Sequence, residues 1–411
     1  MGRVLEHHSK RLLREAGIPT PRNWVAETPE QAEAIVAEYG KPVVLKALVP
    51  VGKRGKAGAV KFAETAGEAR KHAATLLSMT VRHFPVKKIL VEEKIDIAEE
   101  WYLSITIDKH KQLPAVIATR EGGVEVEQLV REHPDRVVIE HVDPFFGLPA
   151  YKAREIWSRL GLNGRPLLQA SQLTTKLYTV FLRFDCYLLE VNPLVLTREG
   201  EVVATASVMA VDDAAMFRQP GLEDMVEVGS ERAWRPLTEL EKRMIAVNDA
   251  DYRGTARYTE MDGGDIGFMC GGGGGSLLSF DALVDLGGRP ANYAETGGNP
   301  SEEKVYELTK GVLSKPGVRG LFVAHNITNN TQVDVMARGI VRALRELGID
   351  PRTFPVVVRE AGVNDALGKQ IFEEAGVEYY GEDVTISEAA AIMVKRMRAA
   401  YPESYSVRRE S

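Results

Sequence analysis

The sequence predicts an α/β protein in two parts, with a mixed pattern of helices and strands in the amino-terminal half and a doubly wound parallel sheet in the carboxy-terminal half. Short apolar runs alternate with helical segments from residue 262 onward, which is typical of parallel strands joined by helical crossovers. Before residue 225, alternating runs such as "EWYLSITID" indicate antiparallel strands. The length of 411 residues is enough for two or three domains.

Composition excludes several classes of function. Charged residues make up 27% of the chain and hydrophobic residues 44%, and the net charge of −6 gives no support for binding nucleic acid or a membrane surface. No run approaches the roughly 20 apolar residues of a membrane span, and the charged amino terminus lacks the apolar core of a signal peptide. Cys186 and Cys270 are the two cysteines, and both lie in strand-like runs, which indicates a reducing, cytoplasmic compartment.

The amino-terminal half begins with a predicted helix over residues 5–16, a proline-containing loop, a helix over 29–39 and the strand "KPVVLKALV". Lys46 lies in the middle of this apolar strand. A buried lysine is unfavourable unless it pairs with an anion, so we predict a phosphate partner for it. The following loop, "GKRGKAGAVKFAE" (residues 52–64), has glycines that let it bend over a nucleotide and basic residues that supply charge. Basic loops are also common on solvated surfaces.

Two further strands carry carboxylates. "ILVEE" predicts a strand in which Glu92 accepts from an adenine amino group or a ribose hydroxyl, or is a solvated charge at a strand end. After a hairpin and two helices (150–162 and 166–184), the strand "LLEVNPLVL" has Glu190 and Asn192 two residues apart, hence on one face. A carboxylate and an amide oxygen together predict a magnesium site beside nucleotide phosphates. The alternative is an edge strand with two exposed polar residues.

The carboxy-terminal half contains five consecutive glycines, residues 271–275, between the strand "DIGFMC" and a helix over 276–288. The loops "TGGNPS" (296–301) and "NITNNT" (326–331) follow the next two strands. In a doubly wound sheet, ligands bind outside the carboxyl ends of the strands. Glycine N–H groups and helix N-termini favour anions there, so we predict an anion-binding site; a flexible tight turn is the alternative. Arg359, at the end of "VVVRE", adds a guanidinium suited to a carboxylate or phosphate.

These motifs support a resemblance that covers nearly the whole chain. The Lys46 strand, "GKRGKAG", "VEE", "EGGVEVE", "GLPAYKAREIWSRLGLNG", "LLEVNPLVLTREGE" and "DDAAMFRQP" occur in this order. The string resembles the ATP-grasp half of the succinyl-CoA ligase β-subunit family, and "GGRPANYAETGGNPSEEKVYELTKGVL" is similar to its carboxy-terminal ligase domain. The family also includes malate–CoA ligase, citryl-CoA synthetase and the amino-terminal half of ATP-citrate lyase. The resemblance implies an ATP-grasp domain over 1–225, a connecting segment over 226–261 and a flavodoxin-like CoA-ligase domain over 262–411.

The resemblance also implies roles for individual residues. Asn192 matches a magnesium ligand, and Glu190 matches a glutamate that steadies a phosphohistidine at the ATP site. The positions that match acid-substrate contacts are Gly271, Asn329, Asn330 and Thr331. The positions that match nucleotide contacts are Lys46, Lys53, Arg54, Gly55, Glu92, Ile95 and Glu100.

The implied reaction converts ATP, a carboxylic acid and CoA into acyl-CoA, ADP and phosphate. ATP and Mg²⁺ are the implied cofactors. The phosphohistidine and most of the CoA site belong to a partner α subunit. The sequence does not decide between ATP and GTP or between a heterodimer and a heterotetramer. It also leaves the direction of flux open. Two rival interpretations are a nucleotide-sensing or structural paralogue without turnover, and a lone-chain ATP-dependent ligase of an acid and an amine.

Two departures from the family pattern bear on substrate and metal. The succinate ligases carry Gly-Ile-Val in place of Asn329–Thr331 and asparagine in place of Gly271, so the polar loop here is closer to citrate-handling relatives. We therefore expect citrate ahead of succinate or malate. The family's second magnesium ligand, an aspartate, corresponds to Ala206, and a nearby lysine corresponds to Val208. The metal site is expected to be incomplete, with either loosely held magnesium or lost activity as the consequence.

Overall fold

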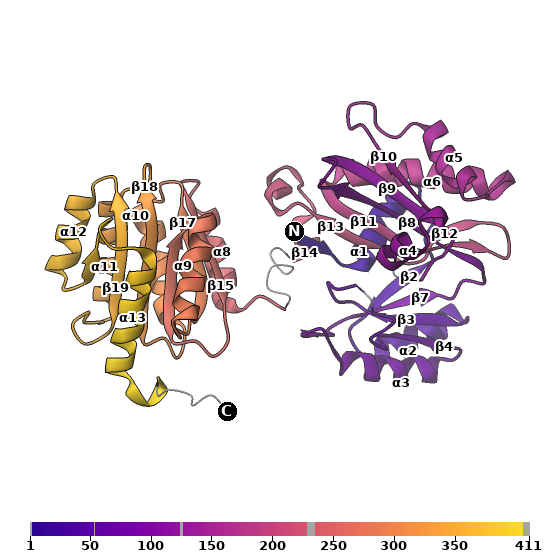
Figure 1. Cartoon of the computed structure of the whole chain (residues 1–411). Helices are drawn as coiled ribbons and strands as arrows, with labels where there is room; N and C mark the ends of the chain where they lie inside the picture. The colour runs from indigo at the N-terminus through magenta and orange to yellow at the C-terminus, as the bar shows by residue number, and fades with distance from the viewer. Residues whose placement is uncertain (1, 53, 124–125, 228–234, 406–411) are drawn as a thin grey trace. The chain divides into compact units, whose positions relative to one another are not determined.

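The chain folds into two compact units, Met1–Pro236 and Leu237–Ser411, each with its own hydrophobic core (Figure 1). The computed structural model describes residues 2–52, 54–123, 126–227 and 235–405. The predicted α/β fold, with a mixed first half and a largely parallel second half, is confirmed. Across the described ranges, no helix combines the length and apolar character that crossing a bilayer requires.

A four-stranded antiparallel sheet forms one part of the amino-terminal unit, and two helices cover one of its faces. Thr28 and Thr65 precede these helices, and each hydroxyl accepts a hydrogen bond from the backbone N–H three residues on, which satisfies a helix-terminal donor. The strands in spatial order are β2 (Asn23–Ala26), β7 (Ile89–Glu93), β3 (Val43–Ala47) and β4 (Val60–Ala63), and the helices are α2 (Pro29–Tyr39) and α3 (Ala66–Leu77). A short hairpin of β5 (Thr80–Val81) and β6 (Phe84–Pro85) follows α3.

A larger antiparallel sheet forms the rest of this unit. Its strands in spatial order are β10 (Val137–His141), β9 (Leu113–Thr119), β8 (Ile97–Asp108), β11 (Cys186–Thr197), β13 (Val208–Val211), β1 (Gly2–Val4) and β14 (Val226–Glu227), and β12 (Val202–Ala204) pairs with β11. The helices packed with this sheet are α1 (Glu6–Glu15), α4 (Val126–Glu132), α5 (Ala150–Arg159) and α6 (Gly164–Arg183). Trp101 and Trp157, with ring centroids 5.5 Å apart, lie in its core.

Helix α1 turns a charged face inward. Glu6, Ser9, Lys10 and Leu13 have the i, i+3, i+4, i+7 spacing that places them on one side of the helix. All four are buried. Ser9 Oγ lies 2.6 Å from Ser207 Oγ, next to β13. The helix therefore brings two charged side chains into the interior, where they need partners from other elements.

The carboxy-terminal unit has a six-stranded sheet in which the order along the chain and the order in space differ. The strands in spatial order are β15 (Thr255–Glu260), β17 (Asn292–Gly297), β16 (Ile266–Gly271), β18 (Gly320–Thr328), β19 (Val356–Gly362) and β20 (Glu378–Tyr380). All pairs are parallel except β15 with β17. The parallel strands have the flavodoxin-like order 2-1-3-4-5, in which a ligand crevice forms between the carboxyl ends of the first and third strands. Those strands are β16 and β18.

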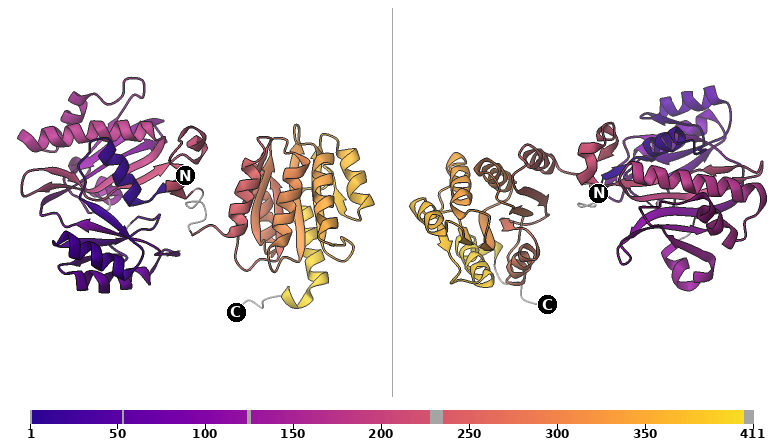
Figure 2. Two further views of the ribbon diagram at one scale, coloured as in Figure 1. Left: turned by 180° about the vertical axis from the view of Figure 1, so that it is seen from behind. Right: turned by 90° about the horizontal axis from the view of Figure 1, so that it is seen from above.

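Helices cover both faces of this sheet, as Figure 2 shows from above. On one face lie α9 (Gly274–Asp285) and α13 (Ile386–Ala400), and on the other α8 (Glu239–Asp249), α10 (Glu302–Ser314), α11 (Val333–Glu346) and α12 (Asp365–Glu374). Ser301 caps α10: its hydroxyl accepts a hydrogen bond from Lys304 N at 3.2 Å. Two layers of helices around one sheet bury the nearly continuous apolar strands.

The second half of the predicted connecting segment 226–261 is part of the carboxy-terminal unit and is not a separate connection. Thr238 and Glu241 form a capping box at the start of α8, and β15 pairs with β17 along its whole length. The Lys304 ammonium, 2% exposed, donates to the carbonyls of Asn248 at 3.0 Å and Gly254 at 3.1 Å. Residues 237–260 therefore belong to the carboxy-terminal unit, because strand pairing and a buried lysine join them to its sheet and to α10.

Candidate functional site

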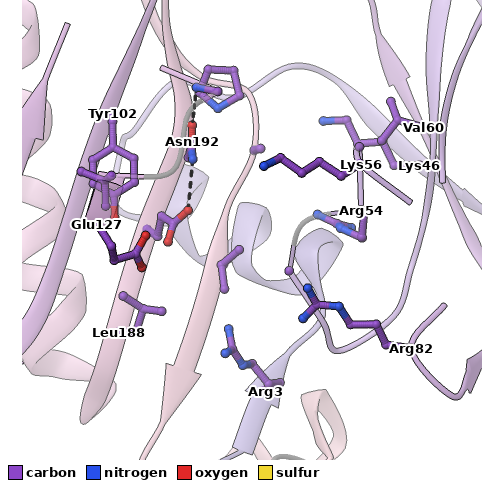
Figure 3. Close-up of a pocket in the computed structure, with 18 residues that line it drawn as sticks. Arg3, Lys46, Arg54, Lys56, Val60, Arg82, Tyr102, Glu127, Leu188 and Asn192 are labelled. Carbon is purple, nitrogen blue, oxygen red and sulfur yellow. Dashed lines mark hydrogen bonds between the residues drawn. The ribbon is translucent and has the colours of Figure 1, made fainter. Parts of the chain in front are cut away.

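A cavity of about 500 Å³ lies between the two sheets of the amino-terminal unit (Figure 3). Five cationic side chains line it, from β1, β3, the loop after β3 and the β5–β6 turn, and they are Arg3, Lys46, Arg54, Lys56 and Arg82. Facing them are side chains from β8, β11 and α4, namely Tyr102, Leu188, Glu190, Asn192 and Glu127. Cations opposite a carboxylate and an amide suit a chain of phosphates that carries a metal ion.

Lys46 is buried in β3, as its position in an apolar strand predicted, but its partners are groups of the protein. Its side-chain nitrogen donates to Glu92 Oε1 at 2.6 Å and to the carbonyl of Thr205 at 2.7 Å, and Glu6 Oε1 lies at 3.4 Å. Two carboxylates thus offset the unfavourable burial of the ammonium group. Lys46 still lines the cavity, so a phosphate oxygen can reach it.

Five charged side chains surround this point, and we call them the Lys46 cluster. Its members are Glu6, Lys10, Lys46, Arg54 and Glu92. Burial by itself would raise the pKa of Glu6, but the neighbouring Arg54, Lys10 and Lys46 outweigh it and hold that pKa well below its ordinary value. Burial would lower the pKa of Lys46, and the charges of Glu6 and Glu92 raise it instead. Glu6 and Lys46 are therefore both ionised at neutral pH.

Glu190 and Asn192 point from β11 into the same cavity, as their spacing predicted. Asn192 Oδ1 accepts a hydrogen bond from Gly123 N at 2.8 Å, and Asn192 Nδ2 donates to Glu190 Oε1 at 3.4 Å. Burial and the charge of Glu190 together raise the pKa of the Tyr102 hydroxyl beside it. The Glu190 carboxylate therefore lies at the edge of a partly desolvated space beside Tyr102.

This pair fits a magnesium ion that is shared with phosphates. An amide oxygen has two lone pairs, so Asn192 Oδ1 retains one beyond its bond to Gly123. Magnesium usually takes one or two carboxylates and completes its octahedron with phosphate and water oxygens. In the part of the chain that the structure describes, no three histidine, cysteine, aspartate or glutamate side chains come together as a metal site. Ala206 and Val208 line the cavity and contribute no oxygen ligand from their side chains.

Arg82 reaches the cavity from a tight turn. Arg82 and His83 form the two-residue connection between β5 and β6, with φ angles of 46° and 70°. Such turns need positive φ at both central residues, and residues other than glycine, asparagine and aspartate rarely adopt it. An unfavourable backbone conformation beside a cavity is a frequent mark of a functional position.

In the carboxy-terminal unit, the glycine run lies at the switch point between β16 and β18. Gly273 has φ 83° and stands before α9, which has no side-chain cap at its first turn. A side chain at Gly271 would lie 3.1 Å from His325 Cδ2, and one at Gly275 would overlap the side chain of Asn326. Glycine is thus favoured at 273 for its positive φ, and glycines at 271 and 275 leave room for two side chains of β18. The exposed N-terminus of α9 favours an anion.

His325 lies beneath this edge and is 2% exposed. Its Nδ1 is 2.6 Å from Glu360 Oε1, and its Nε2 is 3.1 Å from Thr296 Oγ1. Three side chains from β17, β18 and β19 therefore form a buried polar chain across the switch point. Both ring nitrogens are occupied, which fixes the orientation of the imidazole.

Comparison with known proteins identifies both units. Residues 3–196 match the ATP-grasp domain family, and residues 235–400 match the family described as ATP citrate lyase citrate-binding. The succinate–CoA ligase [ADP-forming] subunit beta of Ignicoccus hospitalis is 39% identical over 398 residues, which cover 97% of this chain and 100% of the relative. This chain belongs to the succinate–CoA ligase β-subunit family. The GDP-forming β subunit of Thermus thermophilus is 37% identical, over 95% of this chain and 98% of that one.

A solved structure of ATP citrate lyase from Methanothrix soehngenii, in complex with citrate and coenzyme A, has the same fold. It superposes with a TM-score of 0.80 at 21% identity, covering 96% of this chain and 100% of that one. The chain is thus a subunit of a CoA-ligase family enzyme with an ATP-grasp domain, and ATP and Mg²⁺ are the cofactors of that domain.

The nucleotide positions expected for a succinate–CoA ligase β subunit lie in three environments. Arg54 and Gly55 line the cavity with Lys46. Glu92 does not line the cavity: it is 2% exposed, and its oxygens accept from Lys10 and Lys46. Ile95 is half-buried between β7 and β8, and Glu100 is exposed on β8, where its carbonyl accepts from Gly122 N at 2.9 Å. Lys53 lies outside the described residues.

The expected acid-substrate positions are near the switch point, with one exception. Gly271 ends β16, Asn329 and Asn330 are exposed after β18, and Thr331 is buried, with its hydroxyl 3.4 Å from Asn299 N. Arg359 differs from expectation. Its Nη1 donates to the carbonyl of His325 at 2.6 Å and its Nε to that of Val384 at 2.8 Å, so the guanidinium joins β18 to the segment before α13.

Several residues of the cavity and the Lys46 cluster were not predicted. The inward spacing of Glu6 and Lys10 with Leu13 is a local signal that can be read from the sequence. Arg3, Arg82 and Glu127 carry no such signal, because the pairing of distant strands and the packing of α4 place them. Lys56 lies within the predicted basic loop.

Proposed function

We propose that this chain is the β-type subunit of an ADP-forming acid–CoA ligase that acts with an α-type partner. The observation that carries the proposal is the cavity in which Lys46, Arg54 and further cations face Glu190 and Asn192, in a chain of this family. Cys186 and Cys270 are both free and buried, which supports a cytoplasmic setting. The partner carries the phosphohistidine and most of the CoA site.

The amino-terminal unit positions the nucleotide for the first phosphoryl transfer. The γ-phosphoryl leaves ATP as its bond to the β-phosphate oxygen breaks, and a bond forms to a histidine nitrogen of the partner. Lys46 and Arg54 stabilise the charge that develops on the phosphate oxygens. Mg²⁺, held by Asn192 with Glu190, neutralises phosphate charge when it is bound. Glu190 also accepts a hydrogen bond from the far nitrogen of the partner's imidazole and keeps it oriented.

The carboxy-terminal unit holds the acid substrate. The carboxylate of the acid takes the phosphoryl group from the partner's histidine and becomes an acyl phosphate. The CoA thiolate then attacks the acyl carbon, and phosphate leaves. Gly271 and the first turn of α9 offer backbone N–H groups to a carboxylate, and the amides of Asn329 and Asn330 offer donors to further oxygens. These hydrogen-bond donors favour an acid with more oxygen atoms than succinate.

We expect the assembled complex to prefer citrate to succinate and malate. A site with amide groups loses binding energy when an acid lacks the oxygens that pair with them. The test is co-expression with a candidate α-type subunit, followed by measurement of ADP release from ATP, and in parallel of GDP release from GTP, with CoA and each acid. Absence of acid- and CoA-dependent release of either nucleoside diphosphate would contradict the ligase proposal. A tenfold preference for succinate would contradict only the choice of acid.

A second candidate is a catalytically weakened paralogue that binds nucleotide, and Ala206 is the observation that favours it. A working but weak metal site predicts a clear effect of Ala206→Asp, because the new carboxylate would join Glu190 and Asn192 as a magnesium ligand. The variant should need less magnesium for half-maximal rate and should turn over faster. Magnesium titration of histidine phosphorylation measures this. No phosphorylation in either form, with the partner present, would favour the paralogue. Ala37→Asp, on the exposed face of α2 and outside the cavity lining, is the matched control.

A further inference from the structure

Lys10 is a buried cation that does not touch the cavity. It is 0% exposed, and three oxygen atoms surround its nitrogen: Glu6 Oε1 at 2.8 Å, the carbonyl of Thr205 at 2.7 Å, and Glu92 Oε2. An ammonium group has three N–H donors, and two of these oxygens belong to carboxylates. Burial lowers the pKa of Lys10 from its ordinary value, and the carboxylates of Glu6 and Glu92 oppose that effect. The surroundings are those of a protonated lysine.

The Lys46 cluster contains three cations and two carboxylates, so it has a surplus of one positive charge. Without Lys10, the charges of Lys46 and Arg54 would be balanced by Glu6 and Glu92. A balanced cluster attracts a phosphate only weakly, because each cation that meets it brings a carboxylate nearby.

The surplus positive charge of the cluster faces the cavity at Lys46. Its contact with Glu6, at 3.4 Å, is the longest of its three polar contacts, whereas the corresponding contact of Lys10 is 2.8 Å. The Lys46 side chain is 11% exposed and that of Lys10 0%. Lys10 thus interacts more strongly with the Glu6 carboxylate than Lys46 does. One N–H of Lys46 is therefore only weakly engaged within the protein.

We propose that Lys10 is a positioning residue that sets nucleotide affinity: it neutralises the carboxylates behind Lys46 so that Lys46 and Arg54 keep their charge for the phosphates. This inference rests on the proposed function, and it adds Glu6 and Lys10 of α1 as determinants of affinity that do not themselves bind the nucleotide.

A charge series tests it. Lys10→Met removes the surplus, Glu6→Gln doubles it, and Lys10→Met with Glu6→Gln restores it. We expect ADP binding in the presence of Mg²⁺ to be about tenfold weaker in Lys10→Met, tighter in Glu6→Gln, and close to wild type in the double variant. Isothermal titration of the full-length chain measures these affinities. Lys71→Met, on the exposed face of α3, changes the total charge equally and should have no effect.

The outcomes separate the alternatives. Recovery in the double variant supports the inference, because a purely structural role predicts that two core substitutions are worse than one. Unchanged binding in Lys10→Met, or weaker binding in Glu6→Gln, overturns it; Glu6→Gln gives this answer even if Lys10→Met fails to fold. Absence of ADP and ATP binding by the wild-type chain and its complex with the partner overturns the nucleotide role of the cavity, and the inference with it.

Discussion

Lys46→Ala is expected to abolish detectable nucleotide binding and to destabilise the amino-terminal unit by about 3 kcal/mol. Glu92 is 2% exposed and would lose a donor at 2.6 Å, which leaves a buried carboxylate with less compensation. From the sequence alone the opposite is expected for stability: removal of a buried lysine relieves a desolvation penalty and leaves the fold intact. The structure reverses that expectation, because the lysine has carboxylate partners inside the protein.

Urea unfolding and ADP titration of the same samples measure the two effects separately. The variant Lys46→Ala with Glu92→Gln should regain part of the lost stability, because the uncompensated charge is gone, but should regain no nucleotide binding. If Lys46→Ala were as stable as wild type, Lys10 alone would be sufficient to compensate Glu92. If it retained wild-type affinity, Lys46 would not be a phosphate ligand.

His325→Leu is expected to destabilise the carboxy-terminal unit by about 3 kcal/mol, or about 6–12 °C in its unfolding temperature. Glu360 is 1% exposed, and its Oε1 lies 2.6 Å from Nδ1 of the His325 ring. With leucine there, the carboxylate stays buried with no partner in its place. Thermal unfolding followed by circular dichroism measures the change.

The matched control is His325→Leu with Glu360→Leu. Replacing both partners of a buried pair by apolar groups is often neutral, so the double variant should recover most of the stability. If the double variant lost as much stability as His325→Leu, or more, packing around the ring would explain the effect, and the buried carboxylate would not. Thr296→Val tests the other ring nitrogen and should cost only about 1 kcal/mol, because its partner is neutral.

The elements of the fold were largely predictable, because local patterns specify them. The switch from antiparallel alternation to apolar strands with helical crossovers predicted antiparallel strands in the first unit and a parallel sheet in the second. The same holds for Glu190 and Asn192, since the period of a strand places both in the cavity.

The parts that were not predictable depend on contacts between distant segments. Lys46 was correctly expected to be buried with an anion, yet nothing local distinguishes a phosphate from Glu92, which is 46 residues away, or Glu6, which is 40 away. Arg359 has a chemistry suited to a substrate, but the fold places backbone carbonyls at two of its donors. The boundary near residue 237 was missed because β15 is an edge strand whose pairing partner, β17, comes later in the chain.

The close approach of His325 to Gly271 couples the glycine run to the buried polar side chains beneath it. A methyl group at position 271 would lie 3.1 Å from the imidazole, so the ring would have to shift by a few tenths of an ångström to accommodate it. Thr296 and Glu360 lie against the two ring nitrogens and resist that shift. The room at this edge of the sheet is therefore determined in part by buried contacts, and a larger residue at 271 is expected to be tolerated better once one of those two contacts has been removed.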